Sequence, residues 1–231
     1  MDPDDRLPTY LDTTRSTPPP PGYTMSANAP LQFDVVSMVV NSSLTSSSIS
    51  SWLLVSQANQ MPDYCIVPAP VPYIGRSHEY RLEDCADRRK SVQARPSLSA
   101  SALWNISYKF DGVILNRTDL ARKAPTRAIW SFSIGAIEYA WTVIESDQRL
   151  HLVRATPWPG QSVSSTPSQS RSIRVGLVER KSSSKPSEPA CNIILSGDEL
   201  ATPGASHDRS LMEAVMLMTG VLIAKEVWSI G

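Results

Sequence analysis

Hydrophobic and polar residues alternate one for one along much of the second half of the chain. Between residues 104 and 110 every second side chain is apolar, which is the period of a strand with one buried face. Asp111-Gly112 follows, a dipeptide typical of a tight hairpin turn, and Val113 begins the return. The same alternation recurs in residues 130–134, 137–143, 150–152 and 173–177. Short alternating segments at hairpin spacing predict an antiparallel meander.

Strands are also predicted at residues 33–40, 52–55 and 191–195, where apolar residues cluster. Residues 62–101 show no clean period, and Pro68, Pro70 and Pro72 argue against a central strand there. We therefore expect a long loop or insertion over 62–101, with at most a short strand near 64–67. Further exposed loops are predicted at residues 157–171 and 181–189, which are rich in Pro and Ser.

Residues 1–30 are predicted to be a disordered tail. They contain few large aliphatic residues and the run Pro18-Pro19-Pro20-Pro21, which favours an extended polyproline II conformation. The remaining residues, 31–231, are long enough to form one domain with a core of its own. The expected organisation is therefore a tail followed by a single domain.

The most apolar segment lies close to the C-terminus and predicts a helix over residues 211–228. Ser210 and Glu213 have the spacing of a capping box. Residues 214–224 are apolar on every side of such a helix, so it must be enclosed by protein or by lipid. Because a bilayer span needs about 20 apolar residues, enclosure by the strands is the preferred interpretation. A tail-anchored membrane helix is the weaker alternative.

Paired aromatic residues in the hairpins carry a family resemblance, together with this helix. The segments Phe110-Asp111-Gly112, Trp130-Ser131-Phe132 and Tyr139-Ala140-Trp141 stand in the alternating region. With the helix they resemble a fungal, basidiomycete-type family of tubby-like domains of unknown function. That family is related in fold to the tubby C-terminal, phospholipid scramblase and LURP-one barrels. The resemblance implies a mainly β fold, an antiparallel meander curved into a barrel around the C-terminal helix.

Composition excludes some classes of function. The chain has 22 basic and 22 acidic residues, so nothing favours a nucleic-acid partner. Its cysteines, Cys65, Cys85 and Cys191, form no CxxC pair, and neither a zinc site nor a disulfide framework is expected. The acidic start of the chain does not resemble a secretory signal. We expect a cytoplasmic protein without cofactor or metal.

No catalytic motif is recognisable. The chain lacks a P-loop, a G-x-S-x-G elbow and an H-E-x-x-H sequence. Its histidines, His78, His151 and His207, fall in separate segments without the spacing of a metal site or a triad. Asp198-Glu199 is interpreted as a turn. The sequence therefore predicts a protein that is not an enzyme, with no catalytic residues to name.

The tail contains two matches to the peptides that WW domains bind. Pro20-Pro21-Gly22-Tyr23 fits the P-P-x-Y pattern, and Leu7-Pro8-Thr9-Tyr10 fits its L-P-x-Y variant. WW domains pack preformed polyproline II prolines between aromatic rings, and little chain entropy is lost on binding. The implied partners are WW-domain proteins, including HECT-type ubiquitin ligases. Chance matches in a proline-rich tail are the alternative.

Two groups of basic residues suggest a second kind of partner. Arg117, Arg122, Lys123 and Arg127 form the first group, which is expected in one loop. Arg174, Arg180 and Lys181 belong to the second, with Arg171 and Lys185. Tubby-type relatives bind phosphoinositides through basic surface residues, so the resemblance implies anionic lipids as ligands at the membrane periphery. Solvated loops without a ligand are the alternative.

Overall fold

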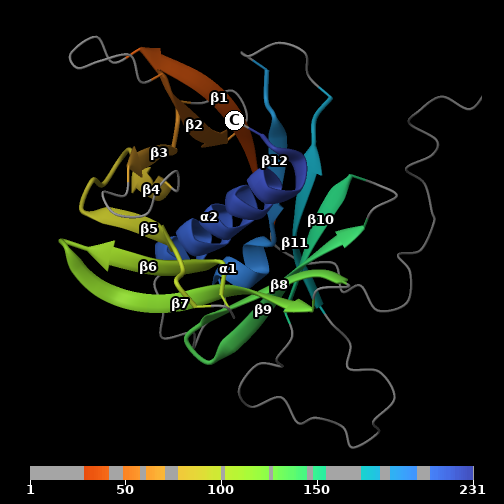
Figure 1. Ribbon diagram of the computed structural model, residues 1–231. Helices are drawn as coiled ribbons and strands as arrows, with labels where there is room; N and C mark the ends of the chain where they lie inside the picture. Colours follow the sequence, from red (N-terminus) through yellow and green to blue (C-terminus); the bar gives the residue numbers. More distant parts are fainter. Residues whose placement is uncertain are drawn as a thin grey trace, which may run out of the picture.

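The strands of the chain join into a closed barrel. The computed structural model describes residues 29–41, 49–57, 61–70, 78–99, 102–124, 127–144, 148–154, 173–182, 188–201 and 209–230. Within these residues twelve strands pair antiparallel in sequence order, and the first closes on the last (Figure 1). The predicted mainly β fold, an antiparallel meander curved into a barrel, is confirmed.

The elements follow one another with short connections where these are described. The strands are β1 (Leu31–Asn41), β2 (Ile49–Gln57), β3 (Tyr64–Pro70), β4 (His78–Asp84), β5 (Lys90–Pro96), β6 (Trp104–Phe110), β7 (Val113–Ala124), β8 (Arg127–Ile134), β9 (Ile137–Ile144), β10 (Arg149–Arg154), β11 (Ile173–Arg180) and β12 (Cys191–Leu195). The helices are α1 (Gly197–Ala201) and α2 (Arg209–Trp228). Closure is visible at Val35, which lies opposite Val55 of β2 and Cys191 of β12.

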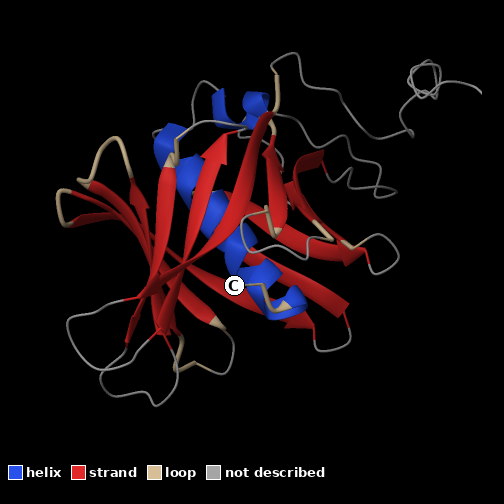
Figure 2. Cartoon of the chain, turned by 90° about the horizontal axis from the view of Figure 1, so that it is seen from above, coloured by secondary structure: helices blue, strands red, loops and turns tan. Residues whose placement is uncertain are grey.

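Helix α2 runs through the inside of the barrel (Figures 1 and 2). All residues from 214 to 224 are buried, and the alternating apolar side chains of the strands form one core with them. The strand side chains that face the core include Phe33, Tyr108, Tyr139 and Trp141, each at most 2% exposed. The predicted enclosure of the helix by the sheet is confirmed. In the described part of the chain, no helix is long and apolar enough to cross a bilayer.

The expected insertion over residues 62–101 is wrong. Strands β3, β4 and β5 occupy this region and complete the barrel between β2 and β6. Pro68 and Pro70 were taken to exclude a central strand, yet both lie in β3. β3 pairs with β2 only over residues 64–66, so both prolines lie beyond the part of β3 that is paired with β2. On the side of β3 that faces β2, no backbone amide donor is needed at these two positions.

The start of α2 and the segment before it also differ from expectation. The helix spans Arg209–Trp228, so Ser210, which was expected just before it, lies in its first turn. Glu213 accepts a hydrogen bond from the hydroxyl of Tyr64 on β3. Asp198 and Glu199, interpreted from the sequence as a turn, belong to the short helix α1. Glu213 and Glu199 each contact a strand that is distant in the sequence, which local patterns do not report.

The remaining predicted segments fall wholly or partly outside the described residues. These are the tail over 1–30, of which only residues 29 and 30 are described, and the loops over 157–171 and 181–189. The division into tail and single domain therefore stays a prediction.

A close contact in the middle of the barrel fixes the position of α2. The indole Nε1 of Trp141 donates to Thr219 Oγ1 at 3.0 Å, and that hydroxyl donates to the Met216 carbonyl at 3.0 Å. Beside it, Gly220 leaves room for the Trp141 ring: a Cβ there would lie 3.1 Å from that ring and 3.4 Å from Val178. The glycine thus allows the indole to approach the helix backbone closely.

We predict that Gly220→Leu lowers the free energy of unfolding by about 1–3 kcal/mol, because the added atoms must displace Trp141 from a packed core. Leucine is a good helix former, so the loss would not come from helix propensity. Denaturant unfolding measures the effect. The control is Glu226→Leu, at an exposed position of the same helix, which should change stability far less. Equal stability of both variants would show that the Trp141 contact is loose.

Candidate functional site

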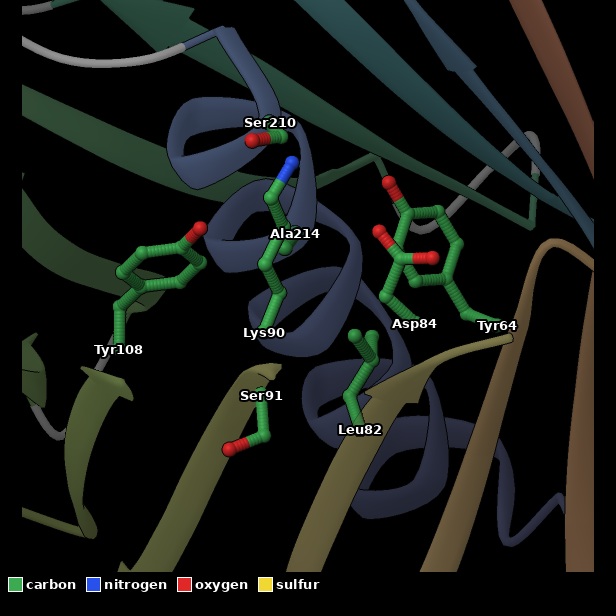
Figure 3. Close-up of a pocket in the computed structure, with 8 residues that line it drawn as sticks. All are labelled: Tyr64, Leu82, Asp84, Lys90, Ser91, Tyr108, Ser210 and Ala214. Carbon is green, nitrogen blue, oxygen red and sulfur yellow. The ribbon is translucent and has the colours of Figure 1, made fainter. Parts of the chain in front are cut away.

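Two hollows among the described residues lie at the end of the barrel where α2 begins. The first lies between the helix and the ends of β3 to β6 (Figure 3). It is lined by Tyr64, Leu82, Asp84, Lys90, Ser91, Tyr108, Ser210 and Ala214. These side chains close on one another and leave no room for a water molecule. This space is part of the packing between helix and sheet.

The second place is an open cleft of about 360 Å³ beside the first. Asp63, Tyr64, Asp84 and Glu213 supply its polar groups. Two of the carboxylates stabilise neighbouring backbone: Asp63 accepts from the amide of Gln57 at 2.8 Å, and Asp84 accepts from two amides of its own turn. The third, Glu213, accepts from Tyr64 Oη at 2.8 Å.

The electrostatics of this cleft follow from burial. Desolvation raises the pKa of Glu213, although the hydrogen bond from Tyr64 and the charge of Arg209 oppose the rise. Burial and the neighbouring Glu213 carboxylate raise the pKa of Tyr64 well above its ordinary range, so its hydroxyl stays neutral and donates. The pair joins the first turn of α2 to β3. Its chemistry is that of a structural hydrogen bond.

A second buried polar cluster joins α1 to the barrel. Glu199 accepts from Tyr139 Oη at 2.8 Å and lies 3.3 Å from Arg154 Nη1. The Arg154 and Glu199 side chains are only 4% and 6% exposed. Desolvation raises the pKa of Glu199, while Arg154 and Tyr139 act in the opposite direction. Since a buried charge needs a partner, the cluster holds α1 over this end of the barrel.

No group of three His, Cys, Asp or Glu side chains in the described residues is arranged to hold a metal ion. Neither polar cluster was found from the sequence, because each joins residues that are far apart in the chain. Glu199 and Glu213 gave no local signal of their burial.

Comparisons with known proteins add no assignment. No family model, no curated protein and no solved structure matches the chain.

The first group of predicted lipid-binding residues does not lie in a loop. Arg117, Arg122 and Lys123 lie on β7, and Arg127 begins β8, with a side chain outside the described residues. Burial does alternate along this part of β7, but the pattern was missed because the buried residue Thr118 is polar. The guanidinium of Arg122 stands 5.8 Å from the centre of the Trp130 ring, and Lys123 forms an ion pair with Glu138.

The second group lies further round the barrel. Arg174 and Arg180 lie on β11, and Lys181 follows it directly. Since β7 and β11 end on the same side, Arg122, Lys123, Arg180 and Lys181 share one end of the barrel, with β8 to β10 between the two pairs. Arg174, at the start of β11, lies at the opposite end. The two groups therefore do not form one continuous patch.

The WW-binding candidates in the tail lie outside the described residues. They are Leu7, Pro8, Tyr10, Pro20, Pro21 and Tyr23.

One exposed surface was missed although the sequence did contain its signal. Val113, Ile114 and Leu115 were interpreted simply as the start of a return strand, yet they are 62%, 38% and 58% exposed. In a strand, three consecutive aliphatic side chains cannot all face the core, because successive side chains point to opposite faces.

The raised pKa of Glu213 predicts a dependence of stability on pH. The native state favours the protonated carboxyl, so the stability from this group is fully present below the ordinary pKa of about 4.3 and is lost as pH rises through the raised native pKa. Glu213→Gln keeps an acceptor for Tyr64 and does not ionise. Its free energy of unfolding, relative to the natural protein, should therefore increase between pH 4 and pH 7.

Denaturant unfolding at both pH values measures this difference. Glu226→Gln, a change at an exposed position of the same helix, serves as control and should show a smaller dependence. A pH-independent difference for Glu213→Gln would contradict the proposed cost of ionising this carboxyl.

Proposed function

We propose that this chain is a non-enzymatic interaction module whose binding surfaces are its tail and the outside of its barrel. The observation that carries the proposal is the filling of the barrel by α2, whose residues 214–224 are all buried. Catalysis on a small molecule normally needs a pocket with convergent polar groups. In the described residues, the polar side chains at the helix start are instead engaged in holding helix and turns.

We further propose that the barrel is a tubby-like domain of the fungal type. What supports this finer assignment is the closed antiparallel meander around a C-terminal helix, together with its paired aromatic hairpins. Trp130 of β8 lies opposite Trp141 of β9, and Phe132 stacks on Tyr139 at 5.5 Å between ring centres.

The partners of the tail in this proposal are cytoplasmic WW-domain proteins, for example ubiquitin ligases of the HECT type. Two motifs on one tail can engage tandem WW domains, and the second contact then forms at a raised effective concentration. A WW-domain partner bound to the tail would thereby be held next to the barrel. The chain thus acts as an adaptor.

We predict that Tyr10→Ala combined with Tyr23→Ala abolishes capture of the full chain by an immobilised tandem WW domain, since each change removes the residue that fills the tyrosine pocket. Each single change should weaken binding by about tenfold or more, because it removes the advantage of two linked contacts. The matched control is Thr9→Ala with Gly22→Ala, which alters only the variable motif positions. Unaltered binding of the double tyrosine variant would show that the motifs are accidental.

A second candidate function is peripheral binding to anionic lipids such as phosphoinositides. The observation that favours it is the row of exposed basic residues on β7, Arg117, Arg122 and Lys123. Each such charge near an anionic membrane surface contributes about 1 kcal/mol. The ion pair of Lys123 with Glu138 reduces the contribution of Lys123 to this attraction.

For this candidate we expect salt-sensitive flotation of the protein with phosphoinositide vesicles. Arg117→Ala combined with Lys123→Ala should weaken binding by about tenfold or more at low salt. Arg81→Ala combined with Arg95→Ala removes two exposed cations from β4 and β5 and serves as control. Equal losses in both variants would indicate a general charge effect rather than a site on β7.

A further inference from the structure

The hairpin of β6 and β7 ends in an apolar tip that the barrel core does not use. Asp111 and Gly112 have φ angles of 52° and 78°, so the chain reverses in a two-residue turn. Beyond it, Ile114 pairs with Lys109 and Asn116 pairs with Tyr108, which leaves Leu115 as an extra residue without a cross-strand partner. Val113 and Ile114 pair regularly and point to opposite faces of the hairpin, yet both are exposed, so neither face is fully covered there.

We name residues 109–115 the hairpin tip. Exposed large hydrophobic residues elsewhere in the described part of the chain are Met38, Met61, Leu98 and Leu103. Only in the hairpin tip do three such residues follow one another, and the turn lies at the outer edge of the barrel in Figure 1. Contiguous exposed apolar residues with a polar rim mark interaction sites more often than single ones do.

Basic side chains surround the hairpin tip. The amide of Asp111 donates to the Arg89 carbonyl at 2.9 Å, so the turn between β4 and β5 lies directly beside it. Arg89 stands 5.1 Å from the centre of the Phe110 ring, and Arg88 is exposed. Residues 84–90 and 109–117 contain five basic residues and three acidic ones. Asp87 forms ion pairs with Arg89 and Lys90, and the other basic residues are Arg88, Lys109 and Arg117. The rim therefore complements a negatively charged partner.

The shape of the hairpin tip decides between kinds of partner. β6 is paired along its whole length with β5, whereas β7 pairs with β8 only over residues 121–124, so β7 keeps one unpaired edge at the hairpin tip. The bulge at Leu115 interrupts this edge, and bulges of this kind disfavour the addition of a further strand. A turn with three apolar side chains is too small for the roughly 800 Å² that each partner buries in a typical protein interface. Lipid, by contrast, can surround a convex tip.

We propose that the hairpin tip is an anchor in the membrane interface. Val113, Ile114 and Leu115 enter the boundary between headgroups and acyl chains of a bilayer that contains anionic lipids. Arg88, Lys109 and Arg117 remain among the headgroups. The Asp111 carboxylate restricts the insertion to a shallow depth, within the outer 5–10 Å or so that interfacial segments reach. The proposal rests on neither the WW motifs nor the β11 cations. Like the second candidate function, it requires binding to a bilayer with anionic lipids.

The test is flotation of the full chain with phosphatidylcholine vesicles, with and without phosphatidylserine. The natural protein should float with the mixed vesicles and much less with phosphatidylcholine alone. Val113→Ser combined with Leu115→Ser should reduce the partition coefficient about 10- to 100-fold, because two exposed aliphatic side chains no longer enter the apolar layer. Leu98→Ser, at a position that is 87% exposed, is the matched control and should bind as the natural protein does.

The outcomes separate this proposal from those above. The serine variant should keep its thermal midpoint and its capture by WW domains, because the changed residues are exposed and lie far along the chain from the tail. If Arg117→Ala with Lys123→Ala loses vesicle binding while the serine variant does not, the hairpin anchor is wrong and the purely electrostatic candidate is favoured. If the natural protein does not bind the vesicles, the hairpin anchor is wrong. The same holds if sedimentation shows that the protein self-associates through the hairpin tip and it does not bind vesicles.

Discussion

The enclosure of α2 is the constraint on which the other features of this structure depend. Residues 214–224 present apolar atoms on every side, and each fully buried aliphatic side chain gains about 1.5–3 kcal/mol over an exposed one. A sheet on one side would leave half of that surface in water. The strands in turn need a partner for their inward faces. A barrel of about eight strands is filled by its own side chains, whereas a helix is about 10 Å wide, so a larger number of strands is needed to surround it.

The parts of the fold that the sequence predicted are those whose signal is local. The two-residue period over 104–110 and 130–143 and the helix over 211–228 need only neighbouring residues to be recognised. Strand β3 was expected at most as a short strand, because proline was taken as a signal against a central strand, and β4 and β5 were missed because their residues show no clean period. Whether a proline is tolerated depends on which backbone amides the adjacent strand uses, and this is set by the register between β2 and β3.

The polar contacts inside the barrel could not be predicted for a related reason. Tyr64 meets Glu213, and Glu199 meets Tyr139 and Arg154, only after the strands have closed around the helix. The basic residues on β7 were placed in a loop for a different reason, because the buried position Thr118 of this strand is polar and hides its period. The exposed aliphatic residues 113–115 are different, since their conflict with strand alternation was present in the sequence.

These contacts also divide the molecule into parts with different roles. The polar side chains of α2 hold the helix in place. Glu213 accepts a hydrogen bond from Tyr64 of β3, Thr219 accepts one from Trp141, and the ammonium of Lys225 donates to the Ile230 carbonyl. Changes there should act on stability. Within the hairpin tip, Val113, Ile114 and Leu115 expose apolar surface to water, which lowers solubility without stabilising the fold. An exposed apolar turn on a barrel whose interior is fully occupied is therefore better explained by binding than by folding.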